Sequence, residues 1–275
     1  MAAVMSDSST RCNGYIRRAS ERRTEWRKGY FKHSPIGLGE TYHIPFNQVT
    51  YNQDGLISLH NTGFADVPRF ARAYAAAKSA GSWAGPWGQV DIHWRAHLLC
   101  WVAQYASRLS GDFVECGVNK GGTAMLVIDY IGLKGSPEKS FYLYDTFEGL
   151  DETLSSELEL RQTEAIYSSC FEEVAKRFAP FPNVIIVKGS IPQSLQLRAP
   201  EQVAYLHIDL NSAYPERAAL EFFWNRLVSG AAVVFDDYAW VACSQQKRAI
   251  DDFALQKGCV VLTVPTGQGL LIKPI

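Results

Sequence analysis

The sequence predicts an α/β fold: a Rossmann-like sheet of seven strands with an antiparallel last strand, preceded by an N-terminal extension. Apolar runs typical of buried strands alternate with helical patterns over residues 112–257, and this alternation favours parallel strands covered by helices on both faces. Two further apolar runs close the chain, and only PTGQ separates them. A parallel crossover needs a dozen or more residues, so these two runs form an antiparallel hairpin if they pair at all.

Residues 1–90 are the predicted N-terminal extension. Residues 1–60 have no regular pattern and read as ordered loop, whereas residues 66–80 combine an early Pro with Ala-rich helix formers and predict a helix. Residues 11–32 carry eight Lys or Arg against two Glu. Such a run is typical of a solvated arm or helix face, and a patch for an anionic partner or substrate is the alternative.

Residues 91–275 are the predicted second domain, which holds the sheet. Its first helix is expected over residues 92–109, where an amphipathic pattern ends at Ser-Gly. The predicted strands cover residues 112–118, 140–147, 183–190, 203–210, 231–237, 259–264 and 269–273. The other helices are predicted over residues 121–133, 157–178, 215–230 and 243–257. Of these, the helix over 215–230 has Pro in its first turn and Gly at its end.

Composition argues against several classes of protein. The net charge of -1 gives no sign of a nucleic-acid partner. No apolar run approaches the length of about 18 residues that a membrane span requires. The six cysteines are scattered, without a C-x-x-C pair or a zinc-ligand spacing, which favours a reducing cytoplasm.

The segment VECGVNKGG (114–122) joins the first strand of the sheet to a helix. Gly lets the backbone approach a ligand closely, and doubly wound sheets bind ligands at this end of a strand. The spacing is not G-x-G-x-x-G, so the dinucleotide fingerprint is not met. It has the looser form acid-x-Gly-x-x-x-Gly, with Glu115, Gly117 and Gly121 in the three places. A plain tight turn between strand and helix is the alternative.

The segment YLYDTFEG (142–149) places Asp145 at the end of the second strand, followed by Thr146. An acidic residue there can accept hydrogen bonds from both ribose hydroxyls of a bound nucleoside. The alternative is a helix N-cap on a surface loop.

Three carboxylates follow two further strands. Asp209 ends the strand in LHIDLN, and Asp236 and Asp237 end the strand in VVFDDY. These strands are consecutive and are expected to be neighbours, so the three acids should converge. Oxygen-only ligands favour a hard cation such as Mg²⁺, which would relieve the repulsion between adjacent negative charges. The alternative is that one Asp caps a helix and another meets an Arg.

Three further residues are weaker candidates. His207 alternates with Asp209 on its strand, so both should share a face. His207 could serve as a base, although a structural histidine is the simpler reading. Arg95 and His97, before the first strand, could reach a substrate.

Together these residues resemble the macrocin O-methyltransferase family. The resemblance covers about residues 112–273 and is carried by VECGVNKGG, YDTFEGL, LHIDLN, VVFDDY and PTGQGLLIK. It implies the class I methyltransferase fold, the cofactor S-adenosyl-L-methionine (SAM), dependence on Mg²⁺ and methylation of sugar hydroxyls in natural products. By this resemblance Glu115, Gly117 and Asp145 would hold SAM, and Gly121, Thr146 and Ser190 complete the predicted cofactor site.

The same resemblance matches Asp209, Asp236 and Asp237 to the metal ligands, with Asp209 also a candidate base. The chain departs from the family pattern in two places. Asn211 stands where a second acid is expected two residues after Asp209, and Ser190 stands where many class I enzymes have an acid near the adenine.

The predicted function is therefore a SAM-dependent, Mg²⁺-assisted O-methyltransferase that acts on a hydroxyl of a sugar or glycosylated metabolite. A catechol-like phenol is an alternative acceptor, but Ser212 stands where a lysine three residues beyond Asp209 would favour it. An oxidoreductase with a nicotinamide cofactor is disfavoured by the unmet fingerprint and the short final hairpin. A non-catalytic SAM-binding protein remains a further alternative.

The N-terminal extension is expected to form a lid over the acceptor or a contact in a homodimer. Aromatic residues among Gly and Pro could stack on the apolar face of a sugar ring, and they could equally pack the extension onto the domain or onto a second subunit. These residues are Tyr42, Phe46, Trp83 and Trp87.

Overall fold

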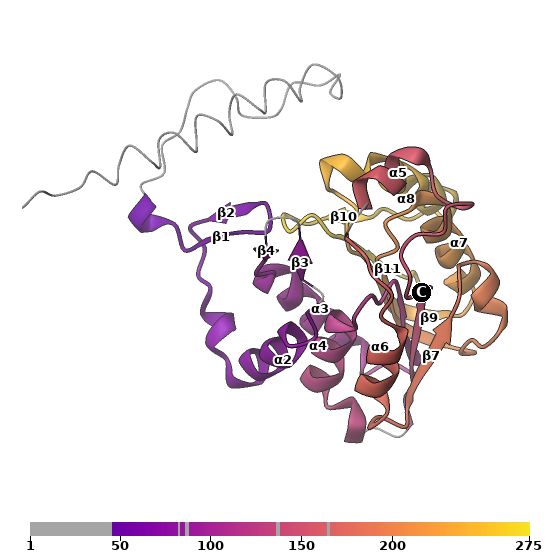
Figure 1. Cartoon of the computed structure of the whole chain (residues 1–275), viewed down its shortest axis with the longest axis horizontal. Coiled ribbons are helices and arrows are strands. Elements are labelled where there is room, and N and C mark those ends of the chain that lie inside the picture. The colour runs from indigo at the N-terminus through magenta and orange to yellow at the C-terminus, as the bar shows by residue number, and fades with distance from the viewer. Residues whose placement is uncertain (1–45, 82, 86–87, 136–137, 164–165) are drawn as a thin grey trace, which may run out of the picture. The chain divides into compact units, whose positions relative to one another are not determined.

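The computed structural model of the chain describes residues 46–81, 83–85, 88–135, 138–163 and 166–275 (Figure 1). The chain divides into two compact units, Met1–Gln48 and Val49–Ile275. The sequence instead places a boundary after residue 90. Residues 49–90 belong with the sheet, because the helix that they contain packs against a helix of the main domain.

In the described part of the chain, the main sheet has seven strands in the order β10-β11-β9-β8-β5-β6-β7. The strands β5 to β9 are parallel, whereas β11 is antiparallel to β9 and β10 is antiparallel to β11. The predicted antiparallel last strand is thus confirmed. The bounds are β5 (Asp112–Cys116), β6 (Phe141–Asp145), β7 (Val184–Lys188), β8 (Val203–Ile208), β9 (Leu227–Phe235), β10 (Leu262–Thr263) and β11 (Gly269–Ile272).

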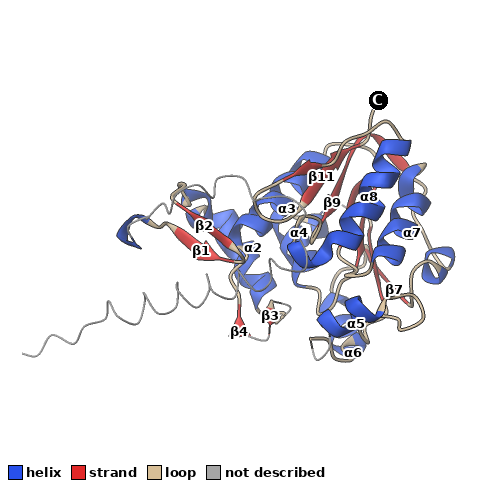
Figure 2. Ribbon diagram, turned by 90° about the horizontal axis from the view of Figure 1, so that it is seen from above, coloured by secondary structure: helices blue, strands red, loops and turns tan. Residues whose placement is uncertain are grey.

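Helices cover both faces of this sheet (Figure 2). One apolar core joins α2, α3, α4 and α6 to one face, and a second core joins α7 and α8 to the other. Residues that alternate along a strand supply the two cores: Phe113 faces the first and Val114 the second. The bounds are α2 (Pro68–Lys78), α3 (His93–Ala106), α4 (Gly122–Ile131), α5 (Glu157–Thr163), α6 (Phe171–Phe178), α7 (Ala213–Trp224) and α8 (Ser244–Gln256).

Short elements complete the described part of the chain. Two small antiparallel pairs precede the sheet, β1 (Tyr51–Gln53) with β2 (Leu56–Ser58) and β3 (Ala84–Gly85) with β4 (Gly88–Gln89). The 3-10 helices are η1 (Phe46–Gln48), η2 (Gly63–Asp66), η3 (Leu133–Gly135), η4 (Gln193–Gln196) and η5 (Val241–Cys243).

The hairpin of β1 and β2 was not predicted, because the region was read as irregular loop. Its turn consists of Asp54 and Gly55, with φ of 51° and 71°. Positive φ at both central residues is the geometry that closes two-residue hairpins, and Asp-Gly is a strong signal for it. The dipeptide between YNQ and LIS was therefore a readable sign of this hairpin.

Two predicted helix boundaries were wrong. The helix expected over 157–178 is two helices, α5 and α6, and Ser168 and Ser169 between them are weak helix formers. The helix expected over 215–230 ends at Trp224, and β9 starts at Leu227. Gly230 does not end a helix: it has φ of 79° inside β9, where the register with β8 shifts. Glycine within a strand commonly marks such a bulge.

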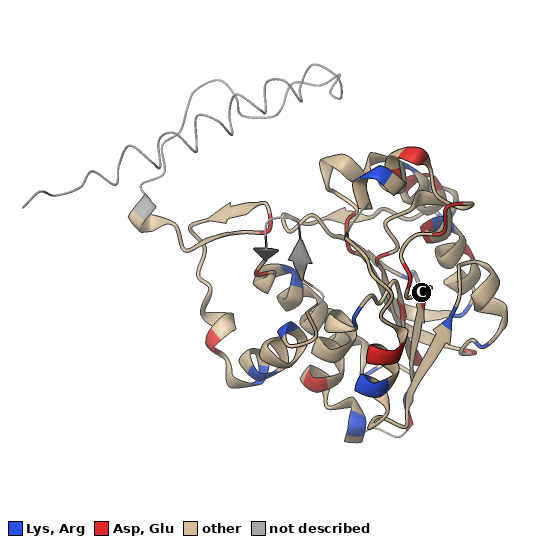
Figure 3. Ribbon diagram, in the orientation of Figure 1, with Lys and Arg blue, Asp and Glu red and all other residues tan. Residues whose placement is uncertain are grey.

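Lys and Arg are interspersed with Asp and Glu along the described helices (Figure 3). None of the helices in that part of the chain combines the length and the apolar character that crossing a bilayer requires.

Candidate functional site

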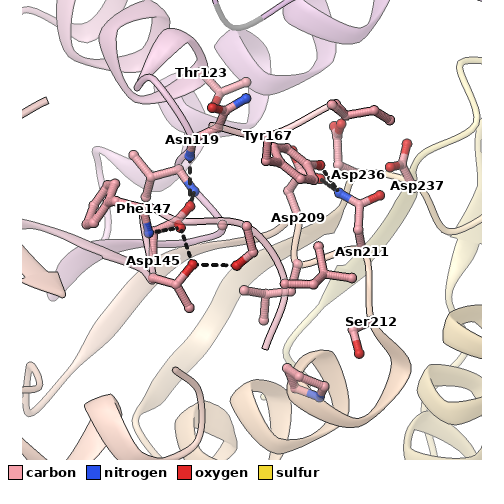
Figure 4. Close-up of a pocket in the computed structure, with 18 of the residues that line it drawn as sticks. Asn119, Thr123, Asp145, Phe147, Tyr167, Asp209, Asn211, Ser212, Asp236 and Asp237 are labelled. Carbon is pink, nitrogen blue, oxygen red and sulfur yellow. Dashed lines mark hydrogen bonds between the residues drawn. The ribbon is translucent and has the colours of Figure 1, made fainter. Parts of the chain in front are cut away.

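A cavity of about 360 Å³ lies at the carboxyl ends of the parallel strands, where doubly wound sheets bind their ligands. Each of these strands ends in residues that line it, and Figure 4 shows how they face the same space. They include Gly117 after β5, Asp145 to Phe147 after β6, Gly189 to Ile191 after β7, Asp209 to Ser212 after β8, and Asp236 and Asp237 after β9.

Gly117 brings the first turn close to the neighbouring strand end. Its φ is 89°, and a Cβ at this position would lie 1.8 Å from the carbonyl oxygen of Asp209. No side chain fits there, so glycine is required for the turn to lie beside Asp209. Gly121, with φ of 82°, is the N-cap of α4 and meets the ring of Phe178. Gly121 does not line the cavity.

The carboxylate of Asp145 fixes the same turn. Its Oδ2 accepts hydrogen bonds from the backbone N–H groups of Val118 at 2.6 Å and Asn119 at 2.7 Å. Its Oδ1 accepts one from the N–H of Phe147 at 2.6 Å and one from Thr146 Oγ1 at 3.3 Å. These four bonds use the usual acceptor capacity of a carboxylate. Asp145 therefore shapes the walls of the cavity as well as lining it.

Ser190 and Thr146 both line the cavity, as the sequence predicts for residues near a cofactor. Ser190 Oγ donates to Asp151 Oδ2 at 2.6 Å, and Asp151 also lines the cavity. A carboxylate from the loop after β6 thus lies beside position 190, where the sequence lacks an acid. The sequence reasoning missed Asp151.

Glu115 and His207 lie below the cavity and do not line it; both are fully buried. They are register partners on the adjacent strands β5 and β8. His207 Nδ1 lies 3.6 Å from Glu115 Oε2, and His207 Nε2 lies 3.5 Å from Asp236 Oδ1. Glu115 Oε1 also accepts a hydrogen bond from Thr123 Oγ1 at 2.6 Å.

The two carboxylates keep His207 charged. Burial by itself lowers the pKa of His207, but attraction to the carboxylates of Asp236 and Glu115 outweighs this effect and raises the pKa to about 10. At neutral pH the imidazole therefore holds its proton and is a poor acceptor for another. The roles that the sequence suggested, cofactor contact for Glu115 and base for His207, do not match these buried positions.

Asp209, Asp236 and Asp237 line the cavity together, as predicted. The main partner of Asp236 and Asp237, however, is a side chain from far away in the sequence. Arg95, in the first turn of α3, lies with its Nη1 2.5 Å from Asp236 Oδ2 and 3.1 Å from Asp237 Oδ1. The other oxygen of Asp236 accepts a hydrogen bond from Gln268 Nε2 at 2.8 Å.

Arg95 also pairs with the turn of the β1–β2 hairpin. Its Nε lies 3.1 Å from Asp54 Oδ2, and its Nη2 lies 3.0 Å from Asp54 Oδ1. The side chains of Arg95 and Asp54 are only 9% and 11% exposed. One guanidinium thus serves three carboxylates in a nearly closed site. Sequence reasoning did not find Asp54, although its Asp-Gly turn signal was visible.

In this arrangement the pKa of Asp236 shifts in the opposite direction to the pKa values of Asp209 and Asp237. Burial raises the pKa of Asp236, but Arg95 and His207 lower it far more, so its pKa is below the usual range. Burial and the neighbouring carboxylates raise the pKa of Asp209 well above its usual value, and burial raises that of Asp237. Asp209 is therefore the stronger proton acceptor.

A hard cation would find oxygen donors here, which is what the sequence predicted. Both oxygens of Asp236 are already used, however, and Arg95 lies between Asp236 and Asp237. Across the described ranges, no group of three or more His, Cys, Asp or Glu side chains could hold a metal ion. As arranged, the residues do not fit a divalent cation, and Mg²⁺ stays a prediction.

Asn211 holds the carboxylate of Asp209, and Tyr167 in turn holds Asn211. Asn211 Nδ2 donates to Asp209 Oδ1 at 3.2 Å and to Tyr167 Oη at 2.9 Å (Figure 4). Tyr167 lies between α5 and α6, where the sequence predicted continuous helix, so nothing in the local pattern marked it.

The remaining candidates are placed as follows. Trp83 lines the cavity and contacts Tyr74, with ring centroids 5.0 Å apart. His97 stacks on Phe64 and does not line the cavity. Phe46 lies in η1. Tyr42, Trp87 and the basic segment 11–32 lie outside the described residues.

Comparisons with known proteins place the chain among methyltransferases. A family model described as macrocin-O-methyltransferase (TylF) matches residues 99–261. The chain is 25% identical over 164 residues to 8-demethyl-8-(2,3-dimethoxy-alpha-L-rhamnosyl)-tetracenomycin-C 4'-O-methyltransferase of Streptomyces olivaceus, a match that covers 56% of this chain. The chain spans 62% of the length of that relative.

Solved structures share the fold. The O-methyltransferase NovP superposes with a TM-score of 0.59 and 18% identity, over 66% of this chain and 80% of NovP. The cofactor-bound protein Rv0187 from MTB superposes with a TM-score of 0.50 and 16% identity, over 77% and 92% of the two chains. The family match spans more than half of this chain and includes the turn after β5 and the acids after β6, β8 and β9. The chain therefore belongs to the macrocin O-methyltransferase family.

Proposed function

We propose that this protein is a SAM-dependent O-methyltransferase that acts on a hydroxyl of a sugar or glycosylated metabolite. Family membership supports the reaction, and the name of the Streptomyces olivaceus relative describes methylation within a rhamnosyl-bearing compound. The observation that carries the proposal is Asp209, a half-buried carboxylate that lies in the same cavity as the glycine turn and whose pKa is raised.

The cavity suits the cofactor in size and in backbone geometry. Its volume of about 360 Å³ falls within the usual range for small-molecule sites. Bound SAM would supply a methyl group activated by its sulfonium. The turn at Gly117 lets the backbone approach this ligand, and the loops after β6 and β7 offer Thr146, Asp151 and Ser190 as further polar contacts.

Asp209 is the proposed general base. In the transfer, the acceptor oxygen bonds to the methyl carbon, the carbon–sulfur bond breaks with its electron pair left on sulfur, and the hydroxyl proton passes to Asp209. A raised pKa makes a carboxylate a better proton acceptor near neutral pH. Tyr167 and Asn211 orient it through the hydrogen bonds described above. His207, held charged between two carboxylates, is left with a structural role in this proposal.

Four finer expectations belong to this proposal. A cytoplasmic location is supported by the cysteines, since the five in the described part of the chain are free. A small-molecule acceptor rather than nucleic acid is supported by the net charge of -1. Mg²⁺ assistance and a homodimer both stay predictions, and the first is tested together with activity.

The decisive experiment incubates the purified protein with labelled SAM and pools of glycosides, including rhamnosides, with catechols as the competing class. Each pool is run with EDTA and with added Mg²⁺. Label transferred to a glycoside hydroxyl supports the proposal, and transfer to catechols alone would replace it with the phenol alternative. Calorimetry with S-adenosylhomocysteine (SAH) completes the test, because SAH binding without transfer to any acceptor points to a non-catalytic SAM-binding protein.

A further inference from the structure

Arg95 supplies a positive charge to the acidic residues at the carboxyl ends of the parallel strands. It is 8% exposed and contacts carboxylates from three separate segments, at Asp54, Asp236 and Asp237. A single nitrogen, Nη1, bridges Asp236 and Asp237. A metal ion shared by these two acids would need the same oxygens, so guanidinium and metal would compete for one place.

The guanidinium is held in that place from the opposite side. Asp54 receives two parallel hydrogen bonds from Nε and Nη2, the fork geometry in which Arg binds a carboxylate most strongly. The ring of Trp240 lies 5.6 Å from its central carbon. Trp240 also packs against the hairpin turn, because a Cβ at Gly55 would come within 2.7 Å of its ring. Arg95 cannot leave without breaking the contact between the hairpin and the end of β9.

The environment of Asp209 gives a second, independent observation. Asn211 stands two residues after Asp209, where the family pattern has an acid, and its amide donates to Asp209. A neutral donor at this position removes one possible metal ligand and satisfies an oxygen of another. Asn211, in place of an acid, and the location of Arg95 thus have the same effect. Both reduce the need for an added cation at this site.

We propose that Arg95 supplies the positive charge on the side of the cavity where Asp209, Asp236 and Asp237 lie. It occupies the place that the sequence assigns to a divalent metal ion. It is a positioning residue, which fixes Asp236 and Asp237 and sets the charge around Asp209. The consequence for turnover rests on the proposed function, whereas the consequence for metal binding does not. Methyl transfer by this chain therefore proceeds without a divalent metal.

The first test uses the wild-type protein. Mn²⁺ binding is measured by electron paramagnetic resonance, and turnover is measured after treatment with EDTA and after addition of Mg²⁺. The proposal expects no stoichiometric Mn²⁺ binding and turnover that chelation leaves within about twofold. Stoichiometric Mn²⁺ binding, or turnover that EDTA abolishes and Mg²⁺ restores, would overturn it. Neither measurement depends on a variant that folds.

The second test compares Arg95→Met with Arg95→Lys. Removal of the guanidinium charge frees the carboxylates of Asp236 and Asp237, so R95M should bind Mn²⁺. R95M should also lose turnover by about tenfold or more, and Mg²⁺ should restore part of that loss. R95K should recover part of the turnover in EDTA without Mn²⁺ binding. The matched control is Arg72→Met, which removes an exposed Arg–Asp pair with Asp129 and should change neither property.

SAH affinity and thermal unfolding, measured on each variant, separate a charge effect from a general loss of structure. An R95M protein that folds, binds SAH and shows no affinity for Mn²⁺ contradicts the proposal. Failure of the wild type to methylate any acceptor overturns the proposed function instead, and the Mn²⁺ measurements then still decide whether Arg95 replaces a metal.

Discussion

Arg95 and Asp54 form a doubly hydrogen-bonded ion pair, with N–O distances of 3.0 and 3.1 Å, that joins the first turn of α3 to the tip of the β1–β2 hairpin. Arg95 also holds the acids after β9, and both Arg95 and Asp54 line the cavity, so the hairpin tip forms part of the wall of the candidate site. A segment that looked like loop in the sequence is thereby coupled to the catalytic end of the sheet.

Gly117→Ala should abolish SAH binding and destabilise the fold. The new Cβ would clash with the carbonyl of Asp209, and the residue would keep an unfavourable positive φ. Gly132→Ala is the matched control, since Gly132 also has positive φ but has no atom within 4 Å of an added Cβ. Urea unfolding should show a cost of about 1 kcal/mol for the control and clearly more for G117A. An equal loss of unfolding free energy in the two variants would mean that the close approach of Gly117 to Asp209 does not matter for stability.

Asp145→Ala should weaken SAH binding by roughly 1–3 kcal/mol, because a charged acceptor of hydrogen bonds is lost from the cavity wall. Asp145→Asn keeps the shape and part of the acceptor capacity, so its loss should be smaller. Calorimetry measures both affinities. If SAH bound D145A as tightly as the wild type, Asp145 would neither contact the cofactor nor shape its turn.

Asp209→Asn should lower kcat by roughly 10²–10⁴ and leave SAH affinity within a few-fold, because it removes the base and keeps the shape. Tyr167→Phe should have a smaller effect on kcat, since it removes one hydrogen bond, of about 1 kcal/mol, from the group that orients Asp209. Tyr214, which is 54% exposed, supplies the control substitution Tyr214→Phe. Near-normal kcat in D209N would assign the proton to another group.

The stability of the protein should depend on His207 at alkaline pH. The folded-state pKa, about 10, is above the unfolded value of about 6.5, so the stabilisation is complete below pH 6.5 and is lost as pH rises toward 10. The difference sets an upper limit of about 5 kcal/mol. Urea unfolding from pH 6 to 10 should show this slope in the wild type and a much smaller one in His207→Gln. The same slope in both proteins would mean that His207 is neutral when folded.

Removal of residues 1–48 should leave SAH binding intact, because the described residues that line the cavity all belong to the second unit. If the first unit forms a lid or a dimer contact, the truncated protein should lose acceptor turnover or dimerisation. Turnover assays and sedimentation analysis test the two possibilities. A fully active protein of unchanged oligomeric state would leave the basic segment without either role.

Much of the fold could be predicted because it is encoded locally. The alternation of apolar runs and helical patterns identified the strands of the main sheet, and the four residues PTGQ between the last two apolar runs were too few for a parallel crossover. The acids at positions 145, 209, 236 and 237 could be assigned to one edge because the carboxyl ends of parallel strands meet there. These inferences need only the order of elements along the chain.

The tertiary structure alone decided which partners those acids have. Arg95 and Asp236 are 141 residues apart, and no local pattern links a residue in a helix to the end of a strand so distant along the chain. Glu115 and His207 are neighbours only because β5 pairs with β8, and together with Asp236 they form a buried charged group. The sequence determined which carboxylates gather at the edge of the sheet. Strand order and helix packing determined that an arginine balances negative charge there, because electrostatic pairing depends on distance in space rather than along the chain.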